Sequence, residues 1–252
     1  MENIDWKILE SKPIFHSNFD HSLFKDKILI MVATHWHLDL IKKSFKSILD
    51  IVEKRDDVYL TVIDNASESP IKTYLKTLKN KRVEINFVDE NLGRAAVFNN
   101  YLKTYVNESN LPEIIVVIDP DITFSIKDFE YLVQGVKNLP KIGMLSMRYK
   151  KNICNPESNL FFRPKNMKGK DGNLYHVSLP FMSNVAGGIF GIKGRILPKD
   201  LNYRIFPKKI YDVYAFDDAS LHDVLKRKGY KNGYLNGTEA THHKSGAEFI
   251  SD

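Results

Sequence analysis

Residues 114–121 read Ile-Ile-Val-Val-Ile-Asp-Pro-Asp, an unbroken apolar run followed at once by two acids that flank a proline. Such a run is typical of a strand buried on both faces, and the acids mark the point where it leaves the sheet. Two carboxylates held this close repel each other unless a cation joins them, and a hard divalent ion suits oxygen ligands. We therefore expect a metal site at Asp119 and Asp121; the alternative is a strand-end turn whose acids face solvent.

Around this stretch, apolar runs alternate with segments of helical period. Strands are expected over 27–33, 58–63, 83–88, 114–118 and 142–147, and helices over 37–54, 69–79, 93–106 and 125–138. Strands and helices alternating in this way predict a mostly parallel sheet covered on both faces. Ligands of such sheets bind beyond the carboxyl ends of the strands, so the polar segments at those ends carry the chemistry.

The second half of the chain has a less regular pattern. Residues 150–175 are polar and rich in Lys, Asn, Gly and Pro, which indicates a mobile loop that carries specificity. An apolar segment interrupted by glycines follows at 185–192, a helix is expected over 217–228, and a short strand over 231–235 ends in a glycine turn.

The composition is that of an ordinary globular protein. Of 252 residues, 43% are hydrophobic and 27% charged, which excludes a disordered tail or a coiled coil. A single cysteine and the lack of a basic-then-apolar leader predict a cytoplasmic protein. The net charge of +6 is compatible with a phosphorylated ligand, an anionic lipid face or nucleic acid.

Two polar segments end the neighbouring strands. Asp64 can accept a hydrogen bond from a nucleobase or ribose, or can form a simple Asx turn. The segment from Asn91 to Arg94 precedes a helix; Gly93 permits close backbone approach, and Arg94 is placed to meet a diphosphate, or is a surface arginine.

Acids and histidines recur late in the chain. Asp217 and Asp218 open a helix, where acids commonly complement the helix dipole, but one of them is a candidate general base. His242 or His243 is a candidate further metal ligand, although histidine pairs are more often on the surface. His35 and His37 form a weaker candidate pair.

The order of these motifs resembles that of the family 2 glycosyltransferases with the GT-A fold, over residues 27–244. The matching segments are Val-Ile-Asp-Asn-Ala-Ser, Glu-Asn-Leu-Gly-Arg-Ala-Ala, Val-Ile-Asp-Pro-Asp, Ala-Gly-Gly-Ile-Phe-Gly-Ile, Phe-Asp-Asp-x-x-Leu and Thr-His-His. The resemblance implies one domain over 27–252, after an N-terminal extension over 1–26. Its Rossmann-like sheet would have a nucleotide-binding half over 27–149 and a smaller acceptor-binding half over 150–252.

The resemblance also implies site residues. Donor contacts would come from Ala33, Thr34, Asp64, Asn91, Gly93, Arg94, Asp119, Gly187 and Gly188. Asp121 would ligate Mn²⁺ or Mg²⁺ with Asp119 and a histidine of the 242–243 pair, and Asp218, beside Asp217, would be the base. Two departures are Thr-His-Trp-His after the first strand, in place of the family's small polar run, and Asp-Asp in place of Glu-Asp.

The resemblance implies an inverting transfer from a nucleotide-diphosphate sugar, with a UDP-sugar favoured, to a saccharide or lipid-linked acceptor hydroxyl. The basic surface then predicts peripheral association with the inner membrane face. A sugar-phosphate nucleotidyltransferase is the nearest alternative, but the glycine-rich basic loop expected after its first strand is absent from Thr34–His37. A glycoside hydrolase would need no nucleotide, and a nucleic-acid binder would gather its lysines into a basic motif that this sequence lacks.

Overall fold

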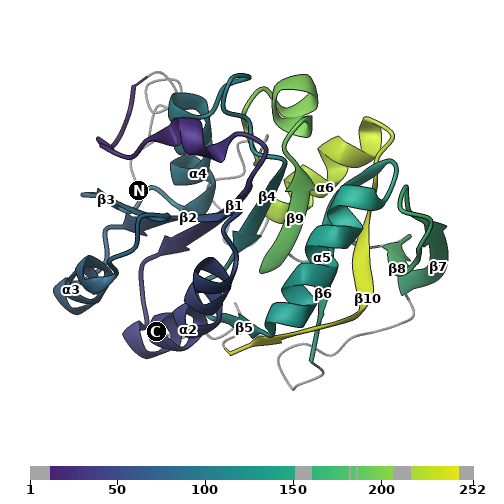
Figure 1. Cartoon of the computed structure of the whole chain (residues 1–252), viewed down its shortest axis with the longest axis horizontal. Helices are drawn as coiled ribbons and strands as arrows, with labels where there is room; N and C mark the ends of the chain where they lie inside the picture. Colours follow the sequence, from purple (N-terminus) through teal and green to yellow (C-terminus); the bar gives the residue numbers. More distant parts are fainter. Residues whose placement is uncertain (1–11, 151–160, 182, 186, 207–216, 244–252) are drawn as a thin grey trace.

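The computed structural model describes residues 12–150, 161–181, 183–185, 187–206 and 217–243 (Figure 1). Its centre is one sheet in the strand order β3-β2-β1-β4-β9-β6-β10-β8-β7, with β5 paired to the end of β10. The strands of the first half are β1 (Ile28–Thr34), β2 (Val58–Asn65), β3 (Val83–Val88), β4 (Ile114–Ile118), β5 (Ile122–Phe124) and β6 (Ile142–Tyr149). Those of the second half are β7 (Phe162–Lys168), β8 (Leu174–Pro180), β9 (Ile189–Lys193) and β10 (Lys231–His242).

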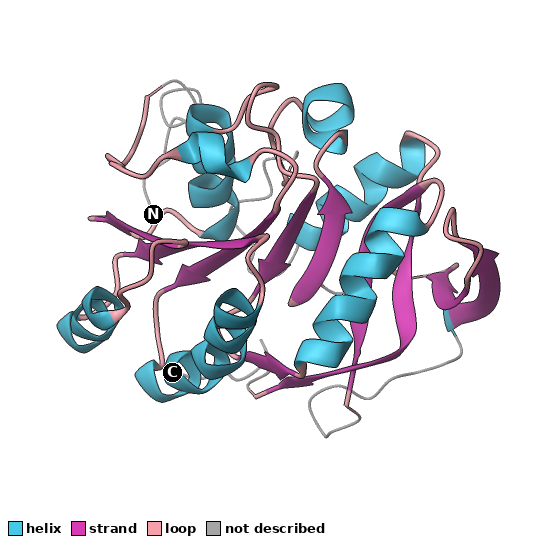
Figure 2. Ribbon diagram, in the orientation of Figure 1, coloured by secondary structure: helices cyan, strands magenta, loops and turns pink. Residues whose placement is uncertain are grey.

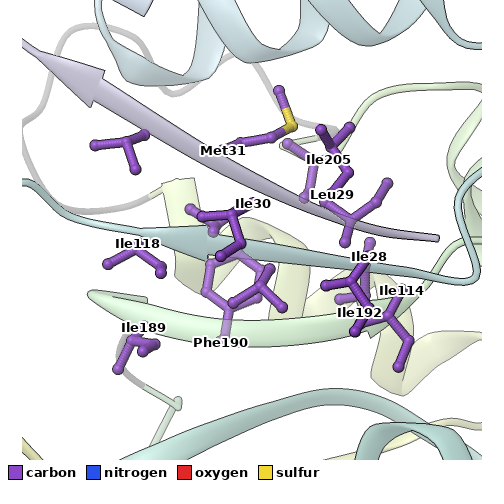
Figure 3. Close-up of a cluster of buried hydrophobic side chains, with 14 of the residues drawn as sticks. Ile28, Leu29, Ile30, Met31, Ile114, Ile118, Ile189, Phe190, Ile192 and Ile205 are labelled. Atoms are coloured by element: carbon purple, nitrogen blue, oxygen red, sulfur yellow. The ribbon is translucent and has the colours of Figure 1, made fainter. Parts of the chain in front are cut away.

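The parallel core of the sheet confirms the predicted α/β class. Strand β1 pairs in parallel with β2 and with β4, so Ile30 lies beside Leu60 on one side and Val116 on the other. Every residue of β4 is fully buried, which explains its uninterrupted apolar sequence. Figure 3 shows these side chains packed with Phe190 and its neighbours on β9. Strand β9 runs antiparallel between β4 and β6 and links the two halves of the sheet.

Helices cover both faces of this sheet (Figure 2). They are α2 (Leu38–Lys54), α3 (Ser69–Thr77), α4 (Arg94–Tyr105), α5 (Ile126–Asn138) and α6 (Asp217–Arg227), with a 3₁₀ turn η1 (His21–Phe24) and a π-helical turn η3 (Leu197–Leu201). Helix α5 begins where Ser125 accepts a hydrogen bond from the Asp128 N–H, an ordinary N-cap. Helix α4 carries Arg94 in its first turn, at the carboxyl end of the parallel strands.

The prediction of a loop over 150–175 was wrong for its described part. Strands β7 and β8 form an antiparallel hairpin, and β8 continues the sheet beside β10. The sequence gives no alternating pattern here because β7 is an edge strand whose residues are mostly exposed. Residues 151–160 lie outside the described part of the chain.

Strand β10 is longer than predicted. Gly237 does not end it; the pairing with β6 shifts between Leu235 and Ala240, and the chain resumes its course to His242. The φ of Gly237 is +88°, which suits such a bulge. The extension carries His242 to the carboxyl end of the sheet, where it meets β5, a three-residue strand that the sequence did not predict.

The described part of the N-terminal extension packs on the domain. Phe15 and Phe24 are buried, and the Asn100 side chain on α4 donates to the Lys12 carbonyl at 2.7 Å. Among the described residues, no helix has both the length and the apolar character needed to cross a membrane.

Candidate active site

The candidate site lies where β1, β2 and β4 end, and it is completed by β9, α4 and α6. Asp119 is the first residue after β4, and its N–H donates to the Gly188 carbonyl at 2.7 Å. This bond joins the end of β4 to the start of β9, because the two strands are neighbours in the sheet. The structure therefore brings the Asp119 and Gly187–Gly188 motifs together, although 68 residues separate Asp119 and Gly187 in the sequence.

Arg94 is the central cation of the site. Its guanidinium forms an ion pair with Asp119 and a bidentate pair with Asp217, with Nε–Oδ2 at 2.9 Å and Nη2–Oδ1 at 2.6 Å. The ring of Phe206 lies beneath it, 5.1 Å from the guanidinium carbon to the ring centroid. Residues from three separate segments thus hold Arg94, the arginine that the sequence analysis predicted to meet a diphosphate.

The two acids that open α6 have different surroundings. Burial raises the pKa of Asp217, but the charge and hydrogen bonds of Arg94 outweigh it and leave that pKa below its ordinary value. The pKa of Asp218 is raised, because burial and the charge of Asp217 outweigh the more distant Arg94. Asp217 is therefore a committed ion-pair partner, whereas Asp218 is the more basic carboxylate.

Gly187 and Gly188 pack closely against side chains of the site, where a Cβ atom would not fit. A Cβ on Gly187 would lie 2.4 Å from the Cβ of Asp218. A Cβ on Gly188 would lie 2.8 Å from the Tyr149 hydroxyl and 3.5 Å from Oδ2 of Asp119. A side chain at Gly187 would displace Asp218, and one at Gly188 would displace the Tyr149 hydroxyl, so glycine is required by the close approach rather than by backbone angles.

Asp121 and His242 form a second pair at the same end of the sheet. His242 Nε2 lies 3.1 Å from Asp121 Oδ2, and Asp121 is only 8% exposed. Burial lowers the pKa of His242, but the hydrogen bond and charge of Asp121 raise it above its ordinary value. A carboxylate oxygen and an imidazole nitrogen this close suit a divalent cation that completes its shell with phosphate oxygens.

The other two residues of the expected metal set point elsewhere. Asp119 faces Arg94, and the ring of His243 contacts Thr123 Oγ1 at 2.8 Å and Lys43 Nζ at 3.3 Å. Within the described residues, no three His, Cys, Asp or Glu side chains are grouped to hold a metal by themselves. Burial raises the pKa of Asp119 to about 6, against the opposing charge of Arg94 and with the help of Asp121.

The expected nucleoside contacts lie across β1 and β2. Thr34 Oγ1 donates to Asp64 Oδ1 at 3.2 Å, and Ala33 precedes it on β1. The second oxygen of Asp64 accepts the Ser67 N–H at 3.2 Å, which is the predicted Asx-type turn, and the residue is fully buried.

The segment before α4 is ordered by asparagines. Asn65 Nδ2 donates to Asn91 Oδ1 at 2.6 Å, and the Gly93 N–H donates to the same oxygen at 3.1 Å. The φ of Gly93 is +79°, which glycine adopts without strain, so the chain can turn into α4 and aim Arg94 at the site.

Two cavities, of about 360 Å³ and about 550 Å³, open on the described part of the chain, and the larger borders the β1–β2 end. It is lined by His35, Trp36, His37, Leu38, Glu68, Pro70 and Ile71. Trp36 is 42% exposed there, and the two histidines flank it without a carboxylate cluster. The Thr-His-Trp-His segment therefore forms a wall of a cavity next to Asp64.

The sequence did not indicate a role in the site for Tyr149 or Phe206. The Tyr149 hydroxyl accepts the Ile189 N–H at 3.0 Å, and Ser146 Oγ donates to the Ile189 carbonyl at 2.6 Å, so hydroxyls of β6 fix the backbone after Gly188. Phe206 supports Arg94 and is held by two hydrogen bonds between its backbone and the Asn99 side chain, at 2.9 and 3.1 Å. Both aromatics look like ordinary core residues in the sequence.

Comparison with known families gives one match. The family described as Glycosyl transferase family 2 matches residues 29–201, more than half of the chain. The match includes the segments of Asp64, Arg94, Asp119 and Gly187–Gly188. We found no match among curated protein sequences.

Solved structures share the fold at low sequence identity. The mannosyltransferase PcManGT from Pyrobaculum calidifontis, in complex with GDP-Man and Mn²⁺, has a TM-score of 0.62 and 16% identity over 98% of this chain. GalNAc-T7 with UDP, GalNAc and Mn²⁺ has a TM-score of 0.59 and 11% identity over 86% of it. S. aureus TarS 1–349 in complex with UDP-GlcNAc has a TM-score of 0.52 and 15% identity over 87%. The chain spans 64%, 43% and 59% of these three chains, so each extends well beyond it.

Proposed function

The chain belongs to glycosyl transferase family 2, and we propose that it transfers a sugar from a nucleotide-diphosphate sugar to a hydroxyl of a saccharide or lipid-linked acceptor, with inversion. The observation that carries this proposal is the different roles that Arg94 imposes on Asp217 and Asp218. One carboxylate is neutralised by the arginine, and its neighbour, packed against Gly187, has a raised pKa. An inverting transfer needs such a base on one side of the sugar.

Donor binding is assigned to the ends of β1, β2 and β4. Asp64 offers a carboxylate to a base or ribose, and Arg94 offers a positive charge to the diphosphate. The structural neighbours were solved with GDP-Man, UDP and UDP-GlcNAc, which supports a nucleotide donor. We retain a UDP-sugar as the favoured donor. Trp36 and His35 line the cavity beside Asp64 and would contact the base.

Asp121 and His242 would hold a divalent cation, and Mn²⁺ in two of the neighbours supports this assignment. When bound, this ion would neutralise charge on the diphosphate leaving group. Asp119, next to Arg94 and Gly188, would orient the ribose side of the donor. His243, held by Thr123 and Lys43, would fix the end of β10 beside Asp121, because its N–H donates to the Asp121 carbonyl at 3.1 Å.

Asp218 would take the proton of the acceptor hydroxyl as that oxygen attacks the anomeric carbon. The bond from this carbon to the diphosphate oxygen breaks as the new glycosidic bond forms, and the nucleoside diphosphate leaves with the bonding electrons. Gly187 lies in close contact with Asp218, so the backbone there would line the side of the sugar that faces the base. Tyr149 and Ser146 hold the backbone that follows Gly188.

The test is a screen of UDP-, GDP- and dTDP-sugars with Mn²⁺, read as thermal stabilisation and as nucleoside diphosphate release. We expect one nucleotide to stabilise the protein in a Mn²⁺-dependent way, and Asp121→Ala to lose that dependence in calorimetry. Lys46→Gln, an exposed change on α2, is the matched control. Stabilisation by no nucleotide, or pyrophosphate release from a sugar phosphate and a nucleoside triphosphate, would contradict the proposal.

A further inference from the structure

A second cavity lies at the opposite end of the sheet from the candidate active site. Its volume is about 360 Å³, within the range of small-ligand sites. It borders Ile114, the first residue of β4, whereas Asp119 follows the last. A five-residue strand spans about 16 Å, so this cavity is not an extension of the donor site.

Basic side chains dominate the wall of this cavity. The lining residues are Lys25, Asp26, Glu108, Leu111, Pro112, Glu113, Ile114, Lys137, Lys170, Lys193 and Arg195. Five are cationic and three are carboxylates, and Glu113 is paired with Lys137 at 2.9 Å. Within the described chain, no ion pair joins Lys25, Lys170 or Arg195 to a carboxylate.

Lys193 is the buried member of this group. It is only 6% exposed, and its ammonium donates to the Leu139 carbonyl at 2.7 Å. Burial, together with the charges of Arg195 and Lys170, lowers its pKa to about 8, and nearby Glu113 compensates only in part. The positive charges of the wall therefore crowd one another, which an incoming anion would relieve.

The backbone holds these cations around one space. A Cβ on Gly194 would lie 1.7 Å from the Pro112 carbonyl oxygen, so the exit of β9 packs directly on the chain before β4. The Gly194 N–H also donates to the Glu113 carbonyl at 2.9 Å. This contact brings Lys193 and Arg195, on either side of the glycine, to the wall that Lys25 and Lys137 share.

We propose that this cavity binds a phosphate group, held by Lys193 at its floor and by Lys170 and Arg195 at its mouth. Ammonium and guanidinium groups gathered in a concave surface are the ordinary means of binding phosphate. The phosphate could belong to a small soluble ester or to an anionic lipid headgroup, and the experiment separates these sources. The proposal does not depend on glycosyl transfer.

Binding would be measured by calorimetry with sodium phosphate at 150 mM NaCl and with EDTA, so that no divalent ion can recruit phosphate to Asp121. Wild type should bind one phosphate. The variant Lys170→Gln/Arg195→Gln, which changes two exposed side chains, should bind at least tenfold more weakly. Lys193→Met should also lose phosphate binding while the folded protein becomes more stable, which separates lost binding from lost folding. Lys46→Gln should bind as wild type does.

Sedimentation with phosphatidylcholine vesicles, with and without phosphatidylglycerol, separates the two sources. Sedimentation of wild type but not of the double variant with phosphatidylglycerol vesicles supports a headgroup ligand, and phosphate should compete. Phosphate binding without sedimentation supports a soluble ester. Absence of both, or equal weakening by Lys46→Gln and the double variant, overturns the proposal.

Discussion

Asp218→Asn should mainly lower turnover and Asp217→Asn should mainly lower stability, although they change adjacent carboxylates to the same isosteric amide. Asp218 accepts the N–H of Ala219 at 2.9 Å, and an asparagine oxygen can accept the same bond. The free energy of unfolding should therefore change by less than about 0.5 kcal/mol. Turnover should fall by about 10²–10⁴, the usual contribution of a general base, with the donor Kd unchanged.

Asp217→Asn removes the charge that faces Arg94. Both side chains are partly buried, at 16% and 20% exposure, so the loss should be below the 3–5 kcal/mol of a fully buried pair. We expect the unfolding free energy to fall by about 2 kcal/mol, because Asp119 still neutralises part of the Arg94 charge. Turnover should fall less than in Asp218→Asn, and the donor Kd should change because Arg94 is released.

The assay combines nucleoside diphosphate release under saturating donor, calorimetry of nucleotide binding, and chemical denaturation of each variant. A double variant tests whether the two effects are independent. If Asp218→Asn kept more than a tenth of wild-type turnover, or if Asp217→Asn lost turnover without losing stability, the division of roles between the two acids would be refuted.

Three further changes test the surroundings of the site and the fold. Gly187→Ala should displace Asp218 and lower turnover at least tenfold, with nucleotide binding by calorimetry unchanged; equal loss of binding would contradict this. Asn99→Asp replaces the donor to the Phe206 carbonyl with an acceptor and should lower the free energy of unfolding in denaturant by about 1–3 kcal/mol. An unchanged unfolding midpoint would show that the Asn99–Phe206 hydrogen bonds do not stabilise the fold. Burial raises the pKa of Glu84, but hydrogen bonds from four side chains bring it below its ordinary 4.5, so its stabilisation is present above pH 4.5 and is lost as pH falls through the lowered value. Glu84→Gln should flatten the acid limb of the unfolding curve, and an unaltered limb would contradict that reasoning.

Strands β1, β2 and β4 were predictable because nearly all of their residues are buried on both faces. Strand β4 has no polar residue, so its limits could be read directly from the sequence. The β7–β8 hairpin could not, since Arg163 to Asn166 are exposed and follow no alternating pattern. The hairpin joins the sheet through the pairing of β8 with β10, a contact between distant segments that no local pattern encodes.

The acids of the candidate site could be predicted from the sequence, but the interactions that give each acid its role could not. Polar residues at strand ends identify Asp64 and Asp119, because parallel strands finish at one edge. The difference in pKa between Asp217 and Asp218 depends on Arg94, which lies 123 residues from Asp217 in the sequence. Tyr149 acts through one hydroxyl on the Ile189 backbone, and an aromatic residue at a strand end carries no sign of that role.

The charge of the site itself argues for a cation in donor binding. Asp119, Asp217 and Asp218 lie around Arg94, and Asp121 lies beside His242 at the same end of the sheet, so four carboxylates outnumber one arginine and one histidine in a partly buried region. The rise in the pKa of Asp119 to about 6, despite an ion pair with Arg94, shows how strongly burial and neighbouring acids oppose further negative charge there. A diphosphate brought to the same place would add to that repulsion. Donor binding should therefore require added positive charge, and the Asp121–His242 pair is where the residues suit it. Tight binding of a nucleoside diphosphate in EDTA, equal to that with Mn²⁺, would show that Arg94 alone suffices and that this charge argument is wrong.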